Sequence, residues 1–400
     1  MKGPVATTTN LFYLFGLFLL LAANSATGFT FTSNNQREDM NCSNVDYTPC
    51  ICDENGMMSC DKISIRNLRT KFSKMPAHEL TGLKLTLSPN ERDLIPDDFL
   101  GQVKLFGDLI IYCLDNKRLR ISQKAFQTSA DMVTRVFIDG CDLSSQPNFS
   151  FMSRFNRMMA VVIKNSKNFK SFKGLPSQSS ALSYVYVTHS RGFESLIADP
   201  VALPALKVLY LNFNEMNDVA ADKIFKSLAA SSLDSLTEIR LDENKLTKIP
   251  DMISSLTKLE QLELGFNEIT VITKNSLPLN NTGGNGLAFN LQKNPITKIE
   301  PGAFGGNIGN SNYVKLQDIN LTELDPKIFK PVLQRMLIRS KKVLGRNPFL
   351  YIGNNPIKCD CHLAWLVRDN RNLLNYIEGA KCSDSKNVVD LKAEDFIRCK

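Results

Sequence analysis

A short apolar pattern recurs along most of this chain and limits the folds open to it. The pattern places leucine or a similar residue at positions one, four, six and eleven, with asparagine or cysteine at position nine. Clear tandem copies are Leu206-Leu209-Leu211-Asn214-Met216, Leu236-Ile239-Leu241-Asn244-Leu246 and Leu259-Leu262-Leu264-Asn267-Ile269, and Phe289-Leu291-Asn294-Ile296 follows. Three such copies in tandem are hard to obtain by chance, so the chain is expected to repeat one small structural unit.

Aligning the copies on position nine gives a row that we call the asparagine column: Asn90, Asn116, Cys141, Ser166, Ser190, Asn214, Asn244, Asn267, Asn294, Ile319 and Asn355. A buried polar side chain here must bond to the backbone of the stacked turns, because leaving it unpaired costs roughly 1–3 kcal/mol. Ile319 cannot do so, and its turn is expected to be looser. The long step after Ile319 indicates an insertion or degenerate unit around 335–345, and the long step after Asn214 indicates a helix through 222–230.

Each unit is expected to supply a short strand, a turn and a return segment that buries residues such as Phe99, Phe126, Phe304 and Phe329. No unit can bury its apolar face alone, so neighbouring units must stack. The sequence therefore predicts an α/β fold, a leucine-rich-repeat solenoid shaped as a curved horseshoe with a parallel concave sheet and disulfide-bonded N- and C-terminal caps. The expected boundaries are a signal peptide at 1–28, an N-terminal cysteine-rich cap at 29–65, about eleven repeats at 66–357 and a C-terminal cysteine-rich cap at 358–400.

The ten cysteines form two terminal groups and a central pair. Cys113 is expected in a strand and Cys141 in the asparagine column, which favours two buried free thiols over a bridge. Spacing leaves three pairings open within each terminal group of four. Zinc binding is the less favoured alternative, because a secretory context favours disulfides, so no metal is expected. The residues predicted to form structural disulfides are Cys42, Cys50, Cys52, Cys60, Cys359, Cys361, Cys382 and Cys399.

The amino-terminal segment has the features of a secretory signal peptide. Lys2 precedes the apolar run Leu11–Ala23, which is short for a transmembrane span, and small residues follow at 26–28. We therefore expect a secreted, extracellular glycoprotein without membrane insertion. Asn280 is the favoured glycosylation site because it lies in a glycine-rich loop at 278–286. The four acceptor sequons begin at Asn280, Asn148, Asn320 and Asn41.

Charge and motif content exclude several classes of function. The formal net charge is +8, and the long basic runs of a nucleic-acid-binding tail are absent, so no nucleic acid partner is expected. The densest basic patch lies between Arg335 and Arg346, where an acidic glycan is a secondary expectation. The chain has three histidines and lacks the G-x-S-x-G, phosphate-loop and H-E-x-x-H motifs. We expect no catalytic residues, no cofactor and no enzymatic activity.

The predicted strands leave two rows of side chains facing away from the core, since alternate strand residues point to opposite sides. The middle of the first row is apolar and aromatic, and the core does not require it. Such a patch indicates a protein-binding site on the concave face, because aromatic residues are enriched in interfaces. The alternative is a ladder of neighbouring side chains that only suits β-propensity. The candidate binding residues are Tyr112, Phe137, Val162, Tyr186 and Tyr210.

The two ends of the mature chain resemble a known family. Thr48-Pro49-Cys50-Ile51-Cys52 and Cys359-Asp360-Cys361-His362-Leu363-Ala364-Trp365-Leu366 are similar to segments of secreted arthropod leucine-rich-repeat proteins named after the non-catalytic subunit of oplophorus luciferase. The resemblance implies first-to-third and second-to-fourth cysteine pairing in each cap. It also implies a non-enzymatic role beside a separate catalytic subunit, with no catalytic residues to transfer.

Three hypotheses follow for the function. The first is a secreted, non-enzymatic scaffold for protein–protein recognition through the concave face. The second is an extracellular-matrix or growth-factor-binding protein that uses glycans and the basic C-terminal patch. The third is a supporting subunit of a secreted luciferase-like oxygenase complex. In each case the expected partner is a protein ligand or a partner subunit.

Overall fold

The computed structural model describes residues 46–88, 94–176, 181–192, 201–228, 230–277, 287–304, 308, 313–342 and 348–399. The predicted signal peptide, Asn41, Cys42, Asn90 and Asn280 lie outside these residues.

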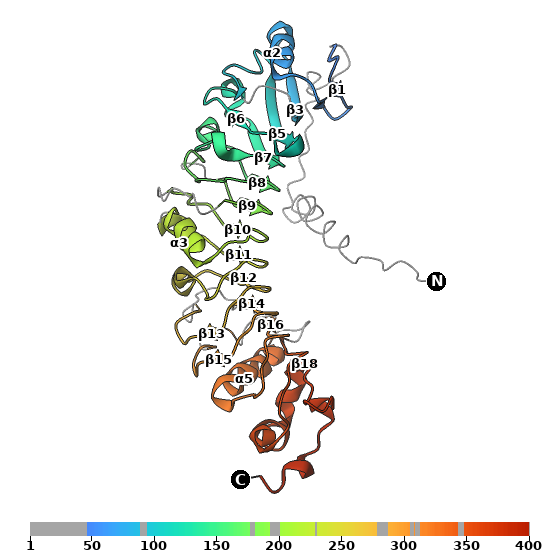
Figure 1. Ribbon diagram of the computed structural model, residues 1–400, viewed down its shortest axis with the longest axis vertical. Helices are drawn as coiled ribbons and strands as arrows, with labels where there is room; N and C mark the ends of the chain where they lie inside the picture. Colours follow the sequence, from blue (N-terminus) through green and yellow to red (C-terminus); the bar gives the residue numbers. More distant parts are fainter. Residues whose placement is uncertain are drawn as a thin grey trace, which may run out of the picture. The chain divides into compact units, whose positions relative to one another are not determined.

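One long sheet connects the described repeats, and its strands follow one another in chain order (Figure 1). β1 runs antiparallel to β2, and the later neighbours pair in parallel. This arrangement is the parallel sheet that the repeat pattern predicts. In order, the strands are β1 (Ile51–Cys52), β2 (Met57–Asp61), β3 (Glu79–Leu87), β5 (Lys104–Cys113), β7 (Val133–Asp139), β8 (Ala160–Lys164), β9 (Tyr184–Thr188), β10 (Val208–Tyr210), β11 (Glu238–Arg240), β12 (Gln261–Glu263), β14 (Ala288–Asn290), β16 (Tyr313–Lys315), β17 (Phe349–Tyr351) and β18 (Ile377–Glu378).

The return segments contain short helices and two small strand pairs. β4 (Leu94–Ile95) pairs with β6 (Arg120–Ile121), and β13 (Val271–Ile272) pairs with β15 (Lys298–Ile299). The helix expected after Asn214 is present, and it begins earlier than predicted. Of the segment expected to be an insertion or a degenerate unit, residues 335–342 belong to a 17-residue helix. The helices are α2 (Ile65–Lys74), α3 (Asp218–Lys226), α4 (Ala230–Leu233), α5 (Pro326–Lys342) and α6 (Ala364–Val367).

The core lies between the sheet and the return segments. In β9, Val185 and Val187 are buried, whereas Tyr184, Tyr186 and Thr188 are half-buried on the other side of the strand. The same alternation occurs in β11, β12, β16 and β17, where the inward residue packs on its counterpart in the next unit. The predicted return-segment phenylalanines complete the core: Phe99, Phe126, Phe304 and Phe329 are all buried.

The asparagine column connects successive turns by hydrogen bonds. Asn244 is buried, and its Oδ1 accepts hydrogen bonds from the backbone N–H groups of Asn214 (3.1 Å) and Met216 (2.9 Å). Its Nδ2 donates to the carbonyl oxygens of Leu211 and Leu241, both at 2.9 Å. One amide therefore satisfies backbone groups in two adjacent repeats. The same type of bonding holds Asn267, Asn294 and Asn355.

Toward the N-terminus, smaller side chains accept some of the equivalent hydrogen bonds. The N–H of Cys141 donates to Ser166 Oγ, and the N–H of Ser166 donates to Ser190 Oγ. Ile319 has no polar side chain, but its own N–H donates to Asn355 Oδ1 at 3.0 Å. A turn without asparagine is thus held by its neighbour on the C-terminal side.

The predicted column is wrong at Asn116, whose side chain is exposed. Tyr112 pairs with Asp139 and Arg118 bridges to Asp142, so the five residues 113–117 stand opposite Gly140 and Cys141. After β5 the chain enters a tight turn in which Asp115 and Asn116 both have positive φ angles. Asparagine tolerates this backbone region well. Asn116 therefore supports a local turn and does not join the ladder.

The prediction of free thiols at Cys113 and Cys141 is also wrong, because the two residues form a disulfide. Both side chains are buried, and their Cα atoms are 4.9 Å apart. The predicted alignment of the first units is shifted by two residues, so it paired Tyr112 with Phe137 instead of Asp139. This shift hid the proximity of Cys113 to Cys141. None of the described cysteines is free.

The two caps contain the expected disulfides. Cys50 bonds to Cys60, and Cys52 is also disulfide-bonded. At the other end, the bridges are Cys359–Cys382 and Cys361–Cys399, which confirms first-to-third and second-to-fourth pairing there.

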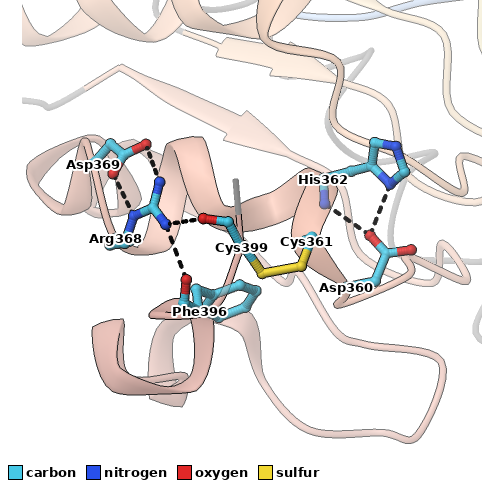
Figure 2. The surroundings of a disulfide bond; sticks show 7 residues. All are labelled: Asp360, Cys361, His362, Arg368, Asp369, Phe396 and Cys399. Atoms are coloured by element: carbon cyan, nitrogen blue, oxygen red, sulfur yellow. Dashed lines mark hydrogen bonds and ion pairs between the residues drawn. A yellow bond between two sulfur atoms is a disulfide. The ribbon is translucent and has the colours of Figure 1, made fainter.

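A guanidinium group reinforces the C-terminal cap (Figure 2). Arg368 Nη1 donates to the carbonyl oxygens of Phe396 (3.0 Å) and Cys399 (2.7 Å), while Asp369 pairs with the same guanidinium. The last turn of the cap is therefore held both covalently and by charge-assisted hydrogen bonds.

Replacing Asn244 by Leu tests the hydrogen bonds of the asparagine column. Leucine fills a similar volume, but it leaves several buried backbone groups of two repeats without partners. We expect the free energy of unfolding to fall by about 2–4 kcal/mol, as measured by urea denaturation. Asn375→Leu, at an exposed position of the C-terminal cap, is the control. Equal urea denaturation midpoints for the two variants would show that the asparagine column does not stabilise the fold in this way.

The Cys113–Cys141 bridge is tested by changing both cysteines to alanine. Loss of a bridge that closes a loop of this length should lower the free energy of unfolding by about 2–4 kcal/mol. Non-reducing peptide mapping of the unaltered protein should join the two peptides. Recovery of both cysteines as free thiols from oxidised, folded protein would contradict the pairing.

Candidate protein-binding site on the sheet

Three rows of side chains face outward from the long sheet. We name them the preceding, central and following rows, according to their order along each strand. In the region of interest, the preceding row includes Tyr184, Glu238 and Tyr313, and the following row includes Asp139 and Asp242. The central row, paired strand to strand, is Lys84, Ile110, Phe137, Val162, Tyr186, Tyr210, Arg240, Glu263, Asn290, Lys315 and Tyr351.

Four of the five predicted binding residues are consecutive in the central row: Phe137, Val162, Tyr186 and Tyr210. The placement of Tyr112 in that row is wrong. Tyr112 pairs with Asp139 in the following row, and Ile110 occupies the position expected for it. The cause is the same two-residue offset that removes Asn116 from the asparagine column. Tyr112 nevertheless contacts Phe137, with ring centroids 5.6 Å apart.

The tyrosines of this surface pack on one another and are half-buried. The rings of Tyr186 and Tyr210 meet edge to face with centroids 4.6 Å apart, and Tyr184 stacks on Tyr186 at 6.3 Å. Edge-to-face contacts add to the stability gained from burial. The rings therefore form a continuous aromatic surface across β9 and β10.

A hydrogen-bonded ion pair adjoins the tyrosines. Tyr210 Oη donates to Glu238 Oε1 at 2.6 Å, and Arg240 Nε and Nη2 donate to the same oxygen at 3.1 Å. The Arg240 guanidinium also lies over the Tyr210 ring, 4.4 Å from its centroid. One carboxylate thus fixes both a phenol and a guanidinium, which in turn fixes the orientation of the aromatic ring.

A second carboxylate repeats this arrangement on the next strands. Tyr313 Oη donates to Glu263 Oε1 at 2.7 Å, and Gln261 Nε2 donates to the same oxygen at 3.1 Å. We call the combined group the tyrosine–carboxylate cluster, which consists of Tyr184, Tyr186, Tyr210, Glu238, Arg240, Glu263 and Tyr313. It extends from β9 to β16.

Burial keeps the phenols of this cluster protonated. It raises the pKa of Tyr186 to about 12, with smaller contributions from Glu238 and Tyr184. Burial likewise raises the pKa of Tyr210 and of Tyr313, each of which also donates to a carboxylate. The hydroxyls therefore remain hydrogen-bond donors at physiological pH.

Asp242 is the most perturbed carboxyl of this surface. Burial, and secondarily the Glu263 carboxylate, raise its pKa from 3.8 to about 7, although Arg240 acts in the opposite direction. No ion pair of Asp242 occurs among the described residues. A negative charge at this position is therefore poorly compensated.

This arrangement provides a rigid surface with aromatic faces, hydrogen-bond acceptors and one fixed guanidinium. Within the described part of the chain, no three His, Cys, Asp or Glu residues are grouped so that they could hold a metal ion, and no helix there is long and apolar enough to cross a membrane. Glu238 and Tyr313 were not predicted, because the sequence pattern was followed only along the central and following rows. Alternation within the three-residue strands could have identified the preceding row.

Asp242→Asn tests the electrostatics of this surface. Because the folded pKa lies above the ordinary value, the folded protein binds a proton that the unfolded chain releases, and stability falls as pH rises from about 4 to about 7. The uncharged amide of asparagine at position 242 does not cause this loss of stability at high pH. The variant should match wild type at pH 4 and melt at higher temperature at pH 8. Asp234→Asn, at an exposed position, is the control, and a difference in melting temperature that does not vary with pH would contradict the assignment.

Comparison with known proteins agrees with this geometry. The leucine rich repeat family matches residues 204–269, which include β10, β11 and β12. The non-catalytic subunit of Oplophorus-luciferin 2-monooxygenase from Oplophorus gracilirostris is 23% identical over 88% of this chain and 86% of its own length. Lumican from Gallus gallus is 31% identical over 38% of this chain and 39% of its own length.

A solved structure supports the fold. A chain in the octameric complex of Latrophilin 3, Unc5D and FLRT2 has a TM-score of 0.52 and 16% identity, and the match covers 88% of this chain and 99% of that one. At this identity the likeness concerns the fold alone. Together with the sheet and the terminal disulfides, it shows that the chain is a leucine-rich-repeat solenoid with disulfide-bonded caps, similar over most of its length to the non-catalytic subunit from Oplophorus.

Proposed function

We propose that this protein is a secreted, non-enzymatic scaffold that binds a protein partner through the outward face of its sheet. The observation that carries the proposal is the tyrosine–carboxylate cluster. A solenoid core needs only the inward rows, yet here the outward rows hold tyrosines and arginine in fixed orientations. These two residue types dominate the binding energy of protein interfaces.

The cluster is suited to binding because its side chains are already ordered. Tyr210 and Arg240 share the Glu238 carboxylate, and Tyr313 is held by Glu263. A partner that covers these groups would immobilise few additional side chains. Binding therefore loses little conformational entropy, which favours affinity.

The comparisons support a non-enzymatic role in an assembly. The relative from Oplophorus is named a non-catalytic subunit, and FLRT2 belongs to a complex with two other proteins. A supporting role beside a separate oxygenase subunit is thus one specific form of the proposal.

Secretion is supported by the disulfides, because such bridges persist mainly in oxidising compartments. The proposed signal peptide at 1–28 agrees with this. Of the two sequon asparagines in the described residues, Asn320 is exposed and Asn148 is half-buried. Asn320 is therefore the better placed acceptor of the two for a glycan, and glycosylation at Asn41 and Asn280 stays a proposal from sequence.

A second candidate function is binding to acidic glycans of the extracellular matrix. Helix α5 carries Lys327, Lys330, Arg335, Arg339 and Lys341 and contains no acidic residue. Attraction of a polyanion to this helix would weaken steeply with added salt, whereas burial of the tyrosines would not. Salt dependence therefore separates the two functions.

The proposal is tested by capture of partners from extracellular fluid with the full chain, followed by affinity measurement on the captured protein. Tyr186→Ala combined with Tyr210→Ala should weaken binding by about 2 kcal/mol or more, roughly 30-fold. Val219→Ala on α3, where the side chain is 62% exposed, is the matched control. Partner binding by the double variant equal to that of the control would place the site elsewhere on the chain.

The double variant must also fold. Tyr210 donates a hydrogen bond to Glu238, so its removal should lower the free energy of unfolding by about 1–2 kcal/mol. Tyr210→Phe removes only the hydroxyl and keeps the ring. Thermal denaturation of both variants separates a binding defect from a folding defect.

A further inference from the structure

A row of exposed and half-buried side chains lies directly after the following row of the sheet. We call it the rim, and it consists of His189, Phe213, Glu243, Phe266 and Lys293. Each rim residue donates its backbone N–H to a carbonyl of the next repeat: Phe213 to Asp242, Glu243 to Gly265, and Phe266 to Gln292. The rim is therefore as regular as the sheet itself.

The two phenylalanines of the rim occupy positions that neither the core nor the backbone favours. Phe213 has φ 59° and is 40% exposed, and Phe266 has φ 56° and is 36% exposed. A positive φ is unfavourable for a bulky residue, and asparagine adopts it more readily. Asparagine does occupy equivalent positions at Asn165 and Asn354, with φ 48° and 57°. Phenylalanine at the rim thus exposes apolar surface at a conformational disadvantage.

Two carboxylates lie between these rings, and each has one cation nearby but no direct ion pair among the described residues: Arg240 acts on Asp242, and Lys293 acts on Glu243. Glu243 is the rim residue between Phe213 and Phe266, and Asp242 precedes it on the same strand end. Neither carboxylate has an ion pair within 4.0 Å in the described chain. The side-chain oxygen of Asn212, beside Asp242, is buried and has no hydrogen-bond donor among the described residues. The described surface therefore presents one buried acceptor without a donor beside two carboxylates.

The rings of this region already attract cations. Lys293 Nζ lies 4.6 Å from the centroid of Phe266, and Arg240 lies over Tyr210. Aromatic faces stabilise positive charge through their quadrupoles. The charged groups of the described chain that act on the rim and on Asp242 are four carboxylates and three cations, so the local charge favours a basic ligand over an acidic glycan; they are Asp139, Asp242, Glu243 and Glu263, and Lys164, Arg240 and Lys293.

We propose that the rim binds a lysine or arginine side chain of an extended segment in the protein partner, seated between Phe213 and Phe266 and against Asp242 and Glu243. Adjacent strands lie about 4.8 Å apart, so residues two strands apart leave about 10 Å for such a side chain. Apolar neighbours of the basic residue would cover the two rings. This inference rests on the proposed function, because it specifies the chemistry of the partner at the same face.

The probe is a set of short synthetic peptides that pair a lysine or arginine with apolar neighbours, each matched by a peptide with glutamine in place of the basic residue. The full chain should bind the basic peptides about tenfold more tightly than their glutamine counterparts. Phe213→Asn combined with Phe266→Asn should abolish this preference and leave the melting temperature unchanged or higher, because asparagine suits the backbone. Val219→Asn is the control, and Glu243→Gln is a second variant that leaves the rings in place.

Equal binding of basic and glutamine peptides, absence of peptide binding, or an unchanged preference in both rim variants would each overturn the inference. Failure of the proposed function gives a different result. If the variant without Tyr186 and Tyr210 captures the partner as well as wild type does, the proposed function is refuted, even if basic peptides bind the rim. Capture that depends on the two tyrosines, without preference for basic peptides, refutes this inference alone.

Discussion

The backbone of the repeat turns imposes the constraint on which the rest of this structure depends. Each turn leaves N–H and C=O groups that belong to no helix or strand, and these groups are buried against the next repeat. Buried backbone groups without partners are costly, so every unit must present a side chain that satisfies them. Asn214, Asn244 and Asn267 do so with amides that bond in two directions. Repeat spacing, sheet register and the position of the outward rows all follow from these bonds.

The N-terminal repeats solve the same problem with other chemistry. Ser166 and Ser190 bond to the neighbouring turn through one hydroxyl each, which offers less than an amide. Beyond them, the longer segment 113–117 stands opposite Gly140 and Cys141, and its asparagine, Asn116, is exposed. There the Cys113–Cys141 bridge connects the two turns. A covalent link thus appears where the hydrogen-bonded ladder ends.

Sequence patterns predicted the register correctly wherever a unit carries all of its anchor residues, as at Asn244 and Asn267. They failed at Asn116, because an asparagine that stabilises a turn with positive φ angles has the same sequence signature as one that joins the ladder. The bridge at Cys113 was missed for the same reason.

The candidate site was predicted in part. Phe137, Val162, Tyr186 and Tyr210 were found because side chains alternate along a strand. Glu238 belongs to the row beside them, and the partner of Tyr313 lies two strands away, which no spacing rule indicates. The burial of Asp242 depends on the side chains packed around it, and a pattern of residue types does not record that packing.

The hydrogen bond between Tyr313 and Glu263 crosses a whole repeat, since β14 lies between their strands. It passes Ala288, whose small side chain separates Gln261 from Tyr313 in the preceding row. Solenoids commonly gain or lose single units during evolution, because each unit contacts only its neighbours. Here duplication of the β14 unit would separate the phenol from its carboxylate, its loss would make their strands direct neighbours, and a larger residue at Ala288 would obstruct the hydrogen bond. The geometry of this hydrogen bond therefore depends on the number of units between β12 and β16, independently of how the core packs.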